Sequence, residues 1–234
     1  MTKKLIATAA LALTAGFAIA QSNGMGMGQD AFVRVVHASP DAPAVDVYVN
    51  GTRTVANAAF KAVTPFGEVP AGKHRVVVTV AGDKNKKVLE TELTLRPGTY
   101  YTVAAIGEVK NLSAKVFTST SMNMNKGKAK LNVYHLSPGA PAVDVRAVDY
   151  NNAKVVSNLA YPNRATAYVD PMAVNANVVP AGKTDIVKNI KGISIAGGKS
   201  YSVFAVGLVG GKGNMAFDLV AAEDKVVAGS MAAK

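Results

Sequence analysis

Three residue types capable of acid–base chemistry recur together in this sequence: a histidine, a serine and an aspartate. The set occurs twice, in Pro-rich stretches at residues 37–47 and 135–145, as His37, Ser39 and Asp46 and then as His135, Ser137 and Asp144. A Ser–His–Asp set can form a hydrolase triad, but a triad also needs an oxyanion hole and a nucleophile elbow, and neither has a signature here. We therefore expect no enzymatic activity and no catalytic residue.

The same stretch has a structural interpretation. Ser39, Asp41 and Asp46 can hydrogen-bond to loop amides, and the prolines fix φ, so the connection between two strands becomes rigid. We predict that the seven residues of the two copies form a structural or binding loop in each. The second copy carries Gly139 where the first has Asp41, so a role that needs Asp41 is not expected in the second copy.

Metal and cofactor sites have little support. His37 and Asp46 supply two ligands per copy, whereas a structural zinc site usually has four. Two thioether pairs of the kind that captures Cu(I) lie in linker-like segments, Met25 with Met27 and Met122 with Met124. Linker methionine is the simpler interpretation. There is no cysteine, phosphate loop, dinucleotide fingerprint or EF-hand spacing, and we expect no metal site and no cofactor.

The N-terminus has the features of a secretory signal peptide. Lys3 and Lys4 precede an apolar stretch of residues 5–20 that ends in Ala18-Ile19-Ala20. This stretch is shorter than the roughly 20 residues that a membrane-spanning helix needs. We predict that residues 1–20 are removed and that the mature protein has no membrane span. We expect it to be exported to the periplasm, the cell surface or the extracellular space.

After a Gly-rich flexible leader at residues 21–30, short β-branched runs alternate with turns. The runs cover residues 32–36, 45–49, 52–55, 63–69, 74–81, 88–95, 99–106 and 114–117. Asn50-Gly51 predicts a hairpin, because both residues tolerate a positive φ. In the run at 88–95, leucines alternate with glutamates and threonines, which is typical of a half-buried antiparallel strand. This strand density predicts a β-sandwich.

The repeat extends beyond the loop and predicts an all-β protein of two tandem antiparallel β-sandwiches, immunoglobulin-like or transthyretin-like. The predicted segments are a first sandwich at 31–121, a linker at 122–129, a second sandwich at 130–222 and a C-terminal tail at 223–234. Pro70–Lys73 recurs as Pro180–Lys183 and Tyr101–Gly107 as Tyr201–Gly207. The difference in residue number between equivalent positions of the two copies, the offset, is 98 at the His-containing loop, 110 at the Pro-Ala-Gly-Lys turn and 100 at the tyrosine run. The larger offset implies an insertion before the second Pro-Ala-Gly-Lys turn.

A family resemblance rests on the first copy. Residues Val33–Gly51 read VRVVHASPDAPAVDVYVNG. This stretch resembles the signature of the secreted bacterial domain-of-unknown-function family 4397, and the resemblance extends over nearly all of residues 31–222 in two copies. It implies an exported β-sandwich module, common in envelope-associated proteins, without an assigned activity. The second copy departs from the pattern at Gly139, at Arg146 in place of Tyr48, and in lacking the Asn-Gly hairpin.

The net charge of the chain suggests binding to polyanions as a further class of function. Without residues 1–20 the chain has 24 basic and 15 acidic residues, a formal charge of +9. Six lysines lie in two clusters that are candidates for polyanion contacts: Lys84, Lys86 and Lys87, and Lys126, Lys128 and Lys130. No aromatic platform accompanies them, so any nucleic-acid binding is expected to be nonspecific and to weaken with salt.

These patterns favour an exported, non-enzymatic tandem β-sandwich protein that acts as a cell-envelope or extracellular binding or structural module. Its partner is then an envelope protein or an anionic polymer. A basic polyanion or nucleic-acid binder is the alternative, and a hydrolase that uses the repeated His/Ser/Asp loop is the third hypothesis.

Overall fold

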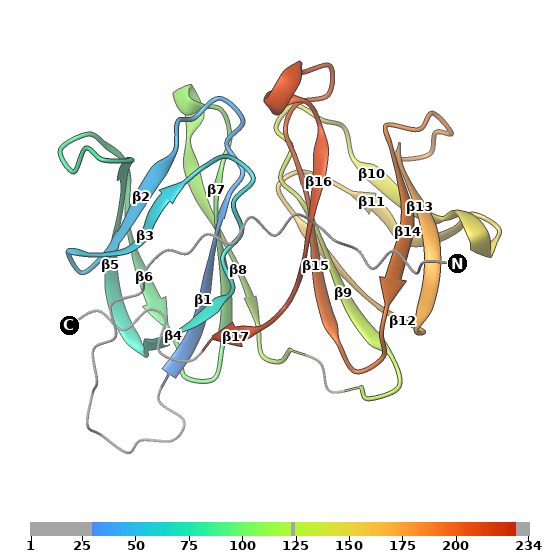
Figure 1. Ribbon diagram of the computed structural model, residues 1–234, viewed down its shortest axis with the longest axis horizontal. Coiled ribbons are helices and arrows are strands. Elements are labelled where there is room, and N and C mark those ends of the chain that lie inside the picture. Colours follow the sequence, from blue (N-terminus) through green and yellow to red (C-terminus); the bar gives the residue numbers. More distant parts are fainter. Residues whose placement is uncertain (1–29, 123–124, 228–234) are drawn as a thin grey trace, which may run out of the picture. The chain divides into compact units, whose positions relative to one another are not determined.

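The computed structural model describes residues 30–122 and 125–227, and this part of the chain is all-β, as predicted (Figure 1). It forms two compact units, which we call the first and the second sandwich. The first contains the described residues up to Ser121 together with those from Lys225 onward, and the second contains Met122–Asp224. The predicted signal peptide at 1–20 and all of the leader except Asp30 lie outside the described residues.

The first sandwich has two sheets, ordered β3-β2-β5-β6 and β17-β4-β1-β7-β8. Its elements are β1 (Asp30–His37), β2 (Val45–Val49), β3 (Thr52–Ala58), β4 (Phe66–Pro70), β5 (Gly72–Val80), β6 (Lys87–Leu95), β7 (Tyr100–Ile106), the 3-10 turn η1 (Val109–Asn111), β8 (Ser113–Ser119) and β17 (Val226–Val227). The pairing of β1 with β7 is parallel, which an all-antiparallel prediction did not include.

The second sandwich repeats this arrangement with sheets ordered β11-β10-β13-β14 and β12-β9-β15-β16. Its elements are β9 (Ala129–His135), β10 (Val143–Ala147), η2 (Val148–Tyr150), β11 (Ala153–Leu159), β12 (Arg164–Val169), β13 (Met172–Pro180), β14 (Lys188–Ile195), β15 (Ser200–Val206), η3 (Gly213–Met215) and β16 (Asp218–Glu223). The parallel pair recurs between β9 and β15. The described residues contain no helix long and apolar enough to cross a membrane.

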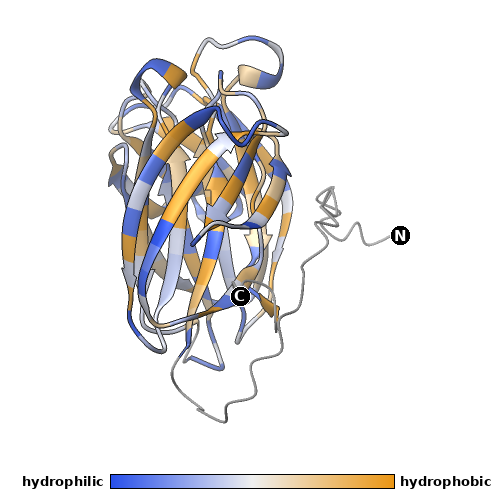
Figure 2. Ribbon diagram, turned by 90° about the vertical axis from the view of Figure 1, so that its left-hand side faces the viewer, coloured by the Kyte–Doolittle hydropathy of each residue, from blue (hydrophilic) through white to orange (hydrophobic). Residues whose placement is uncertain are grey.

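Local sequence signals account for several of these elements. Asn50 and Gly51 join β2 to β3 with φ angles of 49° and 87°, as the hairpin prediction requires. In the second sandwich this connection is longer, and Asn151 and Asn152 take φ angles of 53° and 55° after η2. Alternation of hydrophobic and hydrophilic residues runs along the strands in Figure 2, and β6 shows the predicted half-buried pattern.

The core of each sandwich lies between its two sheets. In the first, Val33 and Val103 of one sheet share a cluster with Leu95 of the other. A second cluster gathers valines of β2, β3 and β5, among them Val45, Val47 and Val78. Valine predominates because a β-branched residue suits a pleated strand. Its short side chain, however, reaches only part of the way across the roughly 10 Å that separates packed sheets.

The two sandwiches keep an almost constant offset, which corrects the predicted insertion. In the first, Val45 of β2 pairs with Val80 of β5, and in the second Val143 of β10 pairs with Pro180 of β13. Pro180 therefore corresponds to Val80 and not to Pro70, and the offset there is 100 rather than 110. The Pro-Ala-Gly-Lys sequence occurs in two turns that are not equivalent. Its glycine recurs because turns of this fold place glycine at positive φ, as in Gly72, Gly82 and Gly182.

The polar segment at 184–190 is consequently not the equivalent of residues 74–80. Residues 184–187 are irregular, and β14 begins only at Lys188. β14 is the last strand of its sheet, and the charged side chains of Lys188 and Lys191 along it discourage pairing with another chain.

The predicted C-terminal tail contains part of the fold. After β16 ends at Glu223, Val226 and Val227 form β17, which pairs in parallel with Phe66 and Gly67 of β4. The Phe66 amide donates to the Lys225 carbonyl at 3.0 Å. The first sandwich is therefore discontinuous in sequence, and a fragment that stops at residue 121 lacks one of its strands.

Deleting residues 225–234 is expected to lower the free energy of unfolding of the first sandwich by about 1 kcal/mol, the contribution of one or two hydrogen bonds at a sheet edge. The measurement is amide hydrogen exchange at Phe66 and Gly67, together with urea unfolding. Deleting only residues 228–234 leaves β17 intact and serves as the control. Equal exchange rates at Phe66 in the two truncated proteins would show that β17 does not stabilise the sheet.

Candidate functional site

The aspartate of the repeated loop lies on the outer face of its sheet. Asp46 stands in β2 between Val45 and Val47, whose side chains belong to the core. Successive residues of a strand point to opposite faces, so Asp46 points away from the core. Its side chain is nevertheless only 2% exposed, because donors surround it: Asn57 N at 2.7 Å, Gly82 N at 3.2 Å and Arg53 Nη1 at 3.4 Å.

An irregularity in β3 supplies the shortest of these bonds. The pairing of β2 with β3 shifts register beside Asp46, and Asn57 takes a φ of 51°. Asparagine is one of the few residues that accept this left-handed conformation readily. The shift frees the Asn57 N–H from the strand ladder, and Asp46 accepts it. Asp46 thereby fastens β3 and the β5–β6 turn to β2.

Asp144 repeats this arrangement in the second sandwich. Its carboxylate accepts from Asn158 N at 2.9 Å and from Gly182 N at 3.4 Å, and Asn158 has a φ of 50°. Lys154 Nζ lies 3.0 Å away and Arg146 3.6 Å away. Both aspartates therefore hold the same two segments, a bulged strand and a Gly turn.

The surroundings favour the charged form of both carboxylates. The Asn158 amide is the largest influence on Asp144, and together with Lys154 and Gly182 it outweighs burial and lowers the pKa to about 2. At Asp46 burial acts to raise the pKa, but the amides of Asn57 and Gly82 and the Arg53 guanidinium together bring it below its ordinary value of 3.8. Neither group is placed to take up a proton near neutral pH.

The two histidines close the end of each core. His37 Nε2 donates to the Pro43 carbonyl at 3.1 Å, and His135 Nε2 donates to Pro141 at 2.9 Å. Both rings are buried and make edge contacts with an aromatic ring, Phe60 in the first case and Tyr161 in the second. Burial lowers the pKa of both imidazoles. Each imidazole therefore holds the proline-containing loop that follows its own strand, through the Pro43 carbonyl in the first sandwich and the Pro141 carbonyl in the second.

Asp41 in the first sandwich and Ser137 in the second attach the loop to the connection between β7 and β8 and to that between β15 and β16, respectively. Ser137 Oγ donates to the Gly207 carbonyl at 2.5 Å. In the first sandwich Ser39 Oγ lies 3.5 Å from Asp41 Oδ1, which also accepts the Val109 amide at 2.9 Å. Ser39 and Ser137 are buried, so neither hydroxyl faces solvent.

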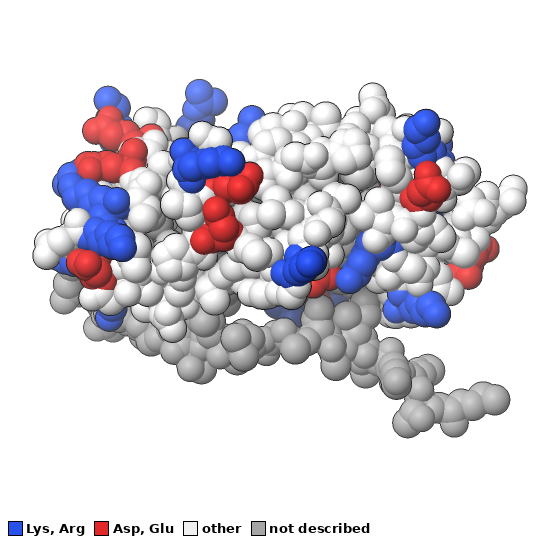
Figure 3. Space-filling model, turned by 90° about the horizontal axis from the view of Figure 1, so that it is seen from above, with Lys and Arg blue, Asp and Glu red and all other residues white. Residues whose placement is uncertain are grey.

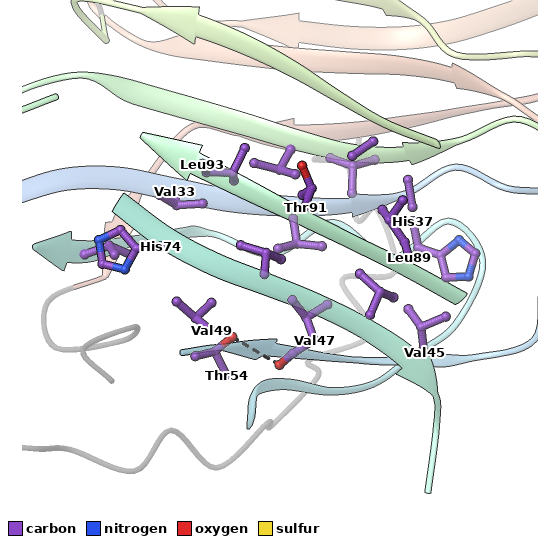
Figure 4. A pocket seen from close by; sticks show the side chains of 18 of the residues that line it. Val33, His37, Val45, Val47, Val49, Thr54, His74, Leu89, Thr91 and Leu93 are labelled. Atoms are coloured by element: carbon purple, nitrogen blue, oxygen red, sulfur yellow. Dashed lines mark hydrogen bonds between the residues drawn. The ribbon is translucent and has the colours of Figure 1, made fainter. Parts of the chain in front are cut away.

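The three residue types that suggested a triad do not meet. His37 lines the space between the two sheets, near Val45 and Val47 (Figure 4), whereas Asp46 lies on the opposite face of β2. The imidazole donor is taken by Pro43, and the Asp46 carboxylate is surrounded by its own donors. Within the described residues, these side chains hydrogen-bond to local backbone and loop groups rather than to one another.

No group of three or more His, Asp or Glu side chains in the described residues is arranged to hold a metal ion. The first methionine pair, Met25 with Met27, lies outside the described residues, as does Met124 of the second pair.

The lysine clusters are less uniform than predicted. Lys84, Lys86 and Lys126 are exposed, but Lys87 pairs with Glu90 at 3.3 Å and Lys128 with Asp170 at 2.8 Å. Lys130 is only 5% exposed, and burial, followed by the nearby Arg164, lowers its pKa. This corrects its assignment as a surface contact. On the face shown in Figure 3, basic and acidic side chains are interspersed.

The partners of the aspartates were not found from the sequence. They are Asn57, Arg53 and Gly82 in the first sandwich and Asn158, Lys154 and Gly182 in the second. The sequence does contain a pattern that could have identified these partners, because Gly82 recurs as Gly182 and Asn57 as Asn158, at offsets of 100 and 101. The false Pro-Ala-Gly-Lys correspondence concealed it.

Comparison with known families identifies one part of the chain. Residues 31–146 match a family described as a domain of unknown function. A DUF4397 domain is present there. The match covers the described first sandwich up to Ser121 and continues through β9 to Arg146 of β10. The match therefore contains both copies of the repeated loop, from His37 to Asp46 and from His135 to Asp144, but only β9 and most of β10 of the second sandwich.

No curated protein matches the chain. Solved structures similar to it include the family CBM26 module CBMbc of Eubacterium rectale Amy13K in complex with maltoheptaose, at 10% identity and a TM-score of 0.24, with 84% of this chain and 97% of that one covered. A proposed cell adhesion protein of Parabacteroides distasonis has 10% identity and a TM-score of 0.22, with 88% and 100% covered. One from Bacteroides eggerthii has 11% identity and 0.20, with 86% and 98% covered.

Proposed function

We propose that the chain is an exported, non-enzymatic binding or structural module of the cell envelope, built from two copies of the DUF4397 domain. One observation carries the proposal: in both sandwiches the residues capable of chemistry are engaged in holding the backbone. The carboxylates hold a bulge and a turn, the imidazoles hold the proline-containing loop through Pro43 and Pro141, and the serines are buried. A scaffold fastened in this way presents surfaces and loops to a partner.

The assignment of the second sandwich as a diverged copy rests on equivalent contacts. His135 and Asp144 make the same bonds as His37 and Asp46, and the parallel pair of central strands recurs. The differences lie in the loops and their partners, and in β17, which adds a fifth strand to one sheet of the first sandwich only. Gly139 replaces Asp41, so the second loop is tied down through Ser137 and Gly207 instead.

Polyanion binding is the second candidate, because Lys84, Lys86 and Lys126 are exposed and the processed chain has a formal charge of +9. Ion pairing of Lys87 and Lys128 and the burial of Lys130 reduce this surface to separated charges. Binding of that kind releases counterions and falls steeply with salt.

The proposal predicts that the mature chain, residues 21–234, is found outside the cytoplasm and is retained by the native envelope at high salt. Cell fractionation with mass measurement tests the first part. Retention on washed envelopes and on duplex DNA, measured from low to high ionic strength, tests the second. Retention that disappears from both with salt, and that Lys84→Gln with Lys86→Gln weakens, would favour the polyanion candidate.

Catalysis is tested on the same preparation. Hydrolysis of a generic ester by the parent protein that is lost in Ser39→Ala without a change in thermal stability would overturn the non-enzymatic proposal. Ala is a suitable replacement because the Ser39 hydroxyl makes only a long contact, at 3.5 Å, with Asp41.

A further inference from the structure

The second sandwich has an open sheet edge at β12. β12 is the terminal strand of its sheet, and no strand of the described residues pairs with its outer side. The His135 amide donates to the Asn163 carbonyl at 2.9 Å, and the six pairs of β12 with β9 then follow without a register shift. Because bonded and non-bonded pairs alternate along an antiparallel ladder, the backbone N–H and C=O groups of Thr166 and Tyr168 point away from β9. They are placed to bond to a further strand.

The equivalent edge of the first sandwich is occupied. β4 holds the place of β12 there, and residues 226–227 run beside it in parallel as β17 (Figure 1). Across this edge the Phe66 amide donates to the Lys225 carbonyl at 3.0 Å. Phe66 corresponds to Thr166, because β4 and β12 keep the same register against β1 and β9. The fold therefore accommodates an added strand at a position that is open in the described part of the second sandwich.

β12 lacks the features that keep an edge strand from pairing. Such strands are commonly protected by lysine, by proline or by a bulge. β11, at the edge of the other sheet, has Lys154 and a shifted register, and β14 has Lys188 and Lys191. β12 reads RATAYV, and its one charged residue, Arg164, stands at the start, where the guanidinium lies over the Tyr134 ring. The rest of the strand presents an unprotected edge.

The side chains of β12 indicate which kind of strand fits beside it. On the outer face Thr166 is exposed and Tyr168 is 49% exposed. On the inner face Ala165 and Val169 pack against the core clusters and are still partly exposed. A neighbouring strand of β-branched residues, like the two valines of β17, would cover apolar surface on both faces.

We propose that the outer edge of β12 binds an extended, valine-rich segment of a partner polypeptide, which joins the sheet in parallel as β17 joins β4. In this mode of recognition main-chain hydrogen bonds supply affinity, and alternate side chains supply selectivity. The inference rests on the proposed function and names its partner class, a protein segment rather than an anionic polymer.

The probe is a capped synthetic peptide with the sequence of residues 224–228, Asp-Lys-Val-Val-Ala. In the mature chain β4 is already paired, so saturable binding should appear at β12 alone, as shifts of the Thr166 and Tyr168 amide signals in NMR spectra. The chain truncated after Asp224 should bind a second peptide at β4, which verifies that the probe can form the strand. A truncated chain that binds the peptide at Phe66 but not at Thr166 would overturn the proposal.

Two variants separate main-chain pairing from side-chain contact. Tyr168→Pro removes an outward N–H that takes no part in the ladder with β9, so the fold should persist and the peptide should bind roughly tenfold more weakly. Tyr168→Ala keeps this N–H and is the matched control, with a smaller expected loss. Thermal melts verify that both variants fold. A folded Tyr168→Pro variant with the affinity of the parent, or equal binding of a peptide whose valines are N-methylated, would contradict strand addition.

Retention on washed native envelopes at high salt separates this inference from the proposed function. Retention that is lost in Tyr168→Pro and kept in Tyr168→Ala would support both. Equal retention of the parent and of Tyr168→Pro would leave the envelope module standing and overturn the role of β12. A parent protein that is not retained would contradict the proposed function alone, since the peptide titration decides on β12 independently.

Discussion

Replacing Asp144 with alanine is expected to lower the free energy of unfolding of the second sandwich by about 1–3 kcal/mol. The substitution leaves the amides of Asn158 and Gly182 without their charged acceptor, and because both residues are exposed, water replaces part of what each hydrogen bond contributed. Lys154 loses its ion pair as well, but its partial exposure makes that a small addition. Urea unfolding and amide exchange at Asn158 measure the effect.

Asp46→Ala should act in the same way on the first sandwich, through Asn57 and Gly82. Asp149→Ala is the control, since that carboxylate binds Asn175 at an exposed site and its removal should cost less. If Asp144→Ala and Asp149→Ala were equally stable, the aspartate of the repeated loop would have no special part in the fold.

Acid is expected to destabilise the second sandwich in two stages. Burial lowers the pKa of His135, so below its ordinary value of 6.5 the unfolded chain takes up a proton that the folded chain resists, and stability falls. Asp144 stays charged down to a pKa of about 2, mainly through the Asn158 amide, whereas an unfolded aspartate is protonated near 3.8. Its contribution is complete above 3.8 and is lost as the pH falls toward 2. Asp144→Ala should remove only this second stage.

The sandwich architecture could be predicted because its signals are local. Alternation in β6 and the Asn50-Gly51 turn each specify a conformation over a few residues. β17 could not be predicted in this way, since two valines carry no period and their partner, β4, is far away in sequence. The burial of Lys130 was also beyond the sequence, because composition does not tell which face of a strand is covered.

The sequence predicted the role of the loop aspartates as acceptors for backbone amides, but not which amides they bind. A repeated aspartate among prolines indicates a carboxylate that holds amides, and Asp46 and Asp144 do hold amides. Which amides they hold depends on a register shift that brings Asn57 beside Asp46. Turn composition misled the alignment, because any tight turn that needs a positive φ selects glycine, whether or not the two turns are equivalent.

Replacing Gly207 with alanine is expected to destabilise the second sandwich by about 3 kcal/mol or more. Gly207 has a φ of 82°, which alone costs a non-glycine residue about 1–2 kcal/mol, and an added Cβ would lie 2.3 Å from the Ala216 carbonyl oxygen. That oxygen belongs to the backbone and cannot rotate away, so the loop must shift. The Gly207 carbonyl, which accepts the Ser137 hydroxyl, must shift with it.

Gly210→Ala is the matched control, because Gly210 has a φ of 80° with no atom within 4 Å of the new Cβ, and only the conformational cost should appear. Urea unfolding of both variants, with amide exchange of residues 136–140, separates the two contributions, and equal losses of stability would show that close packing at Gly207 does not matter.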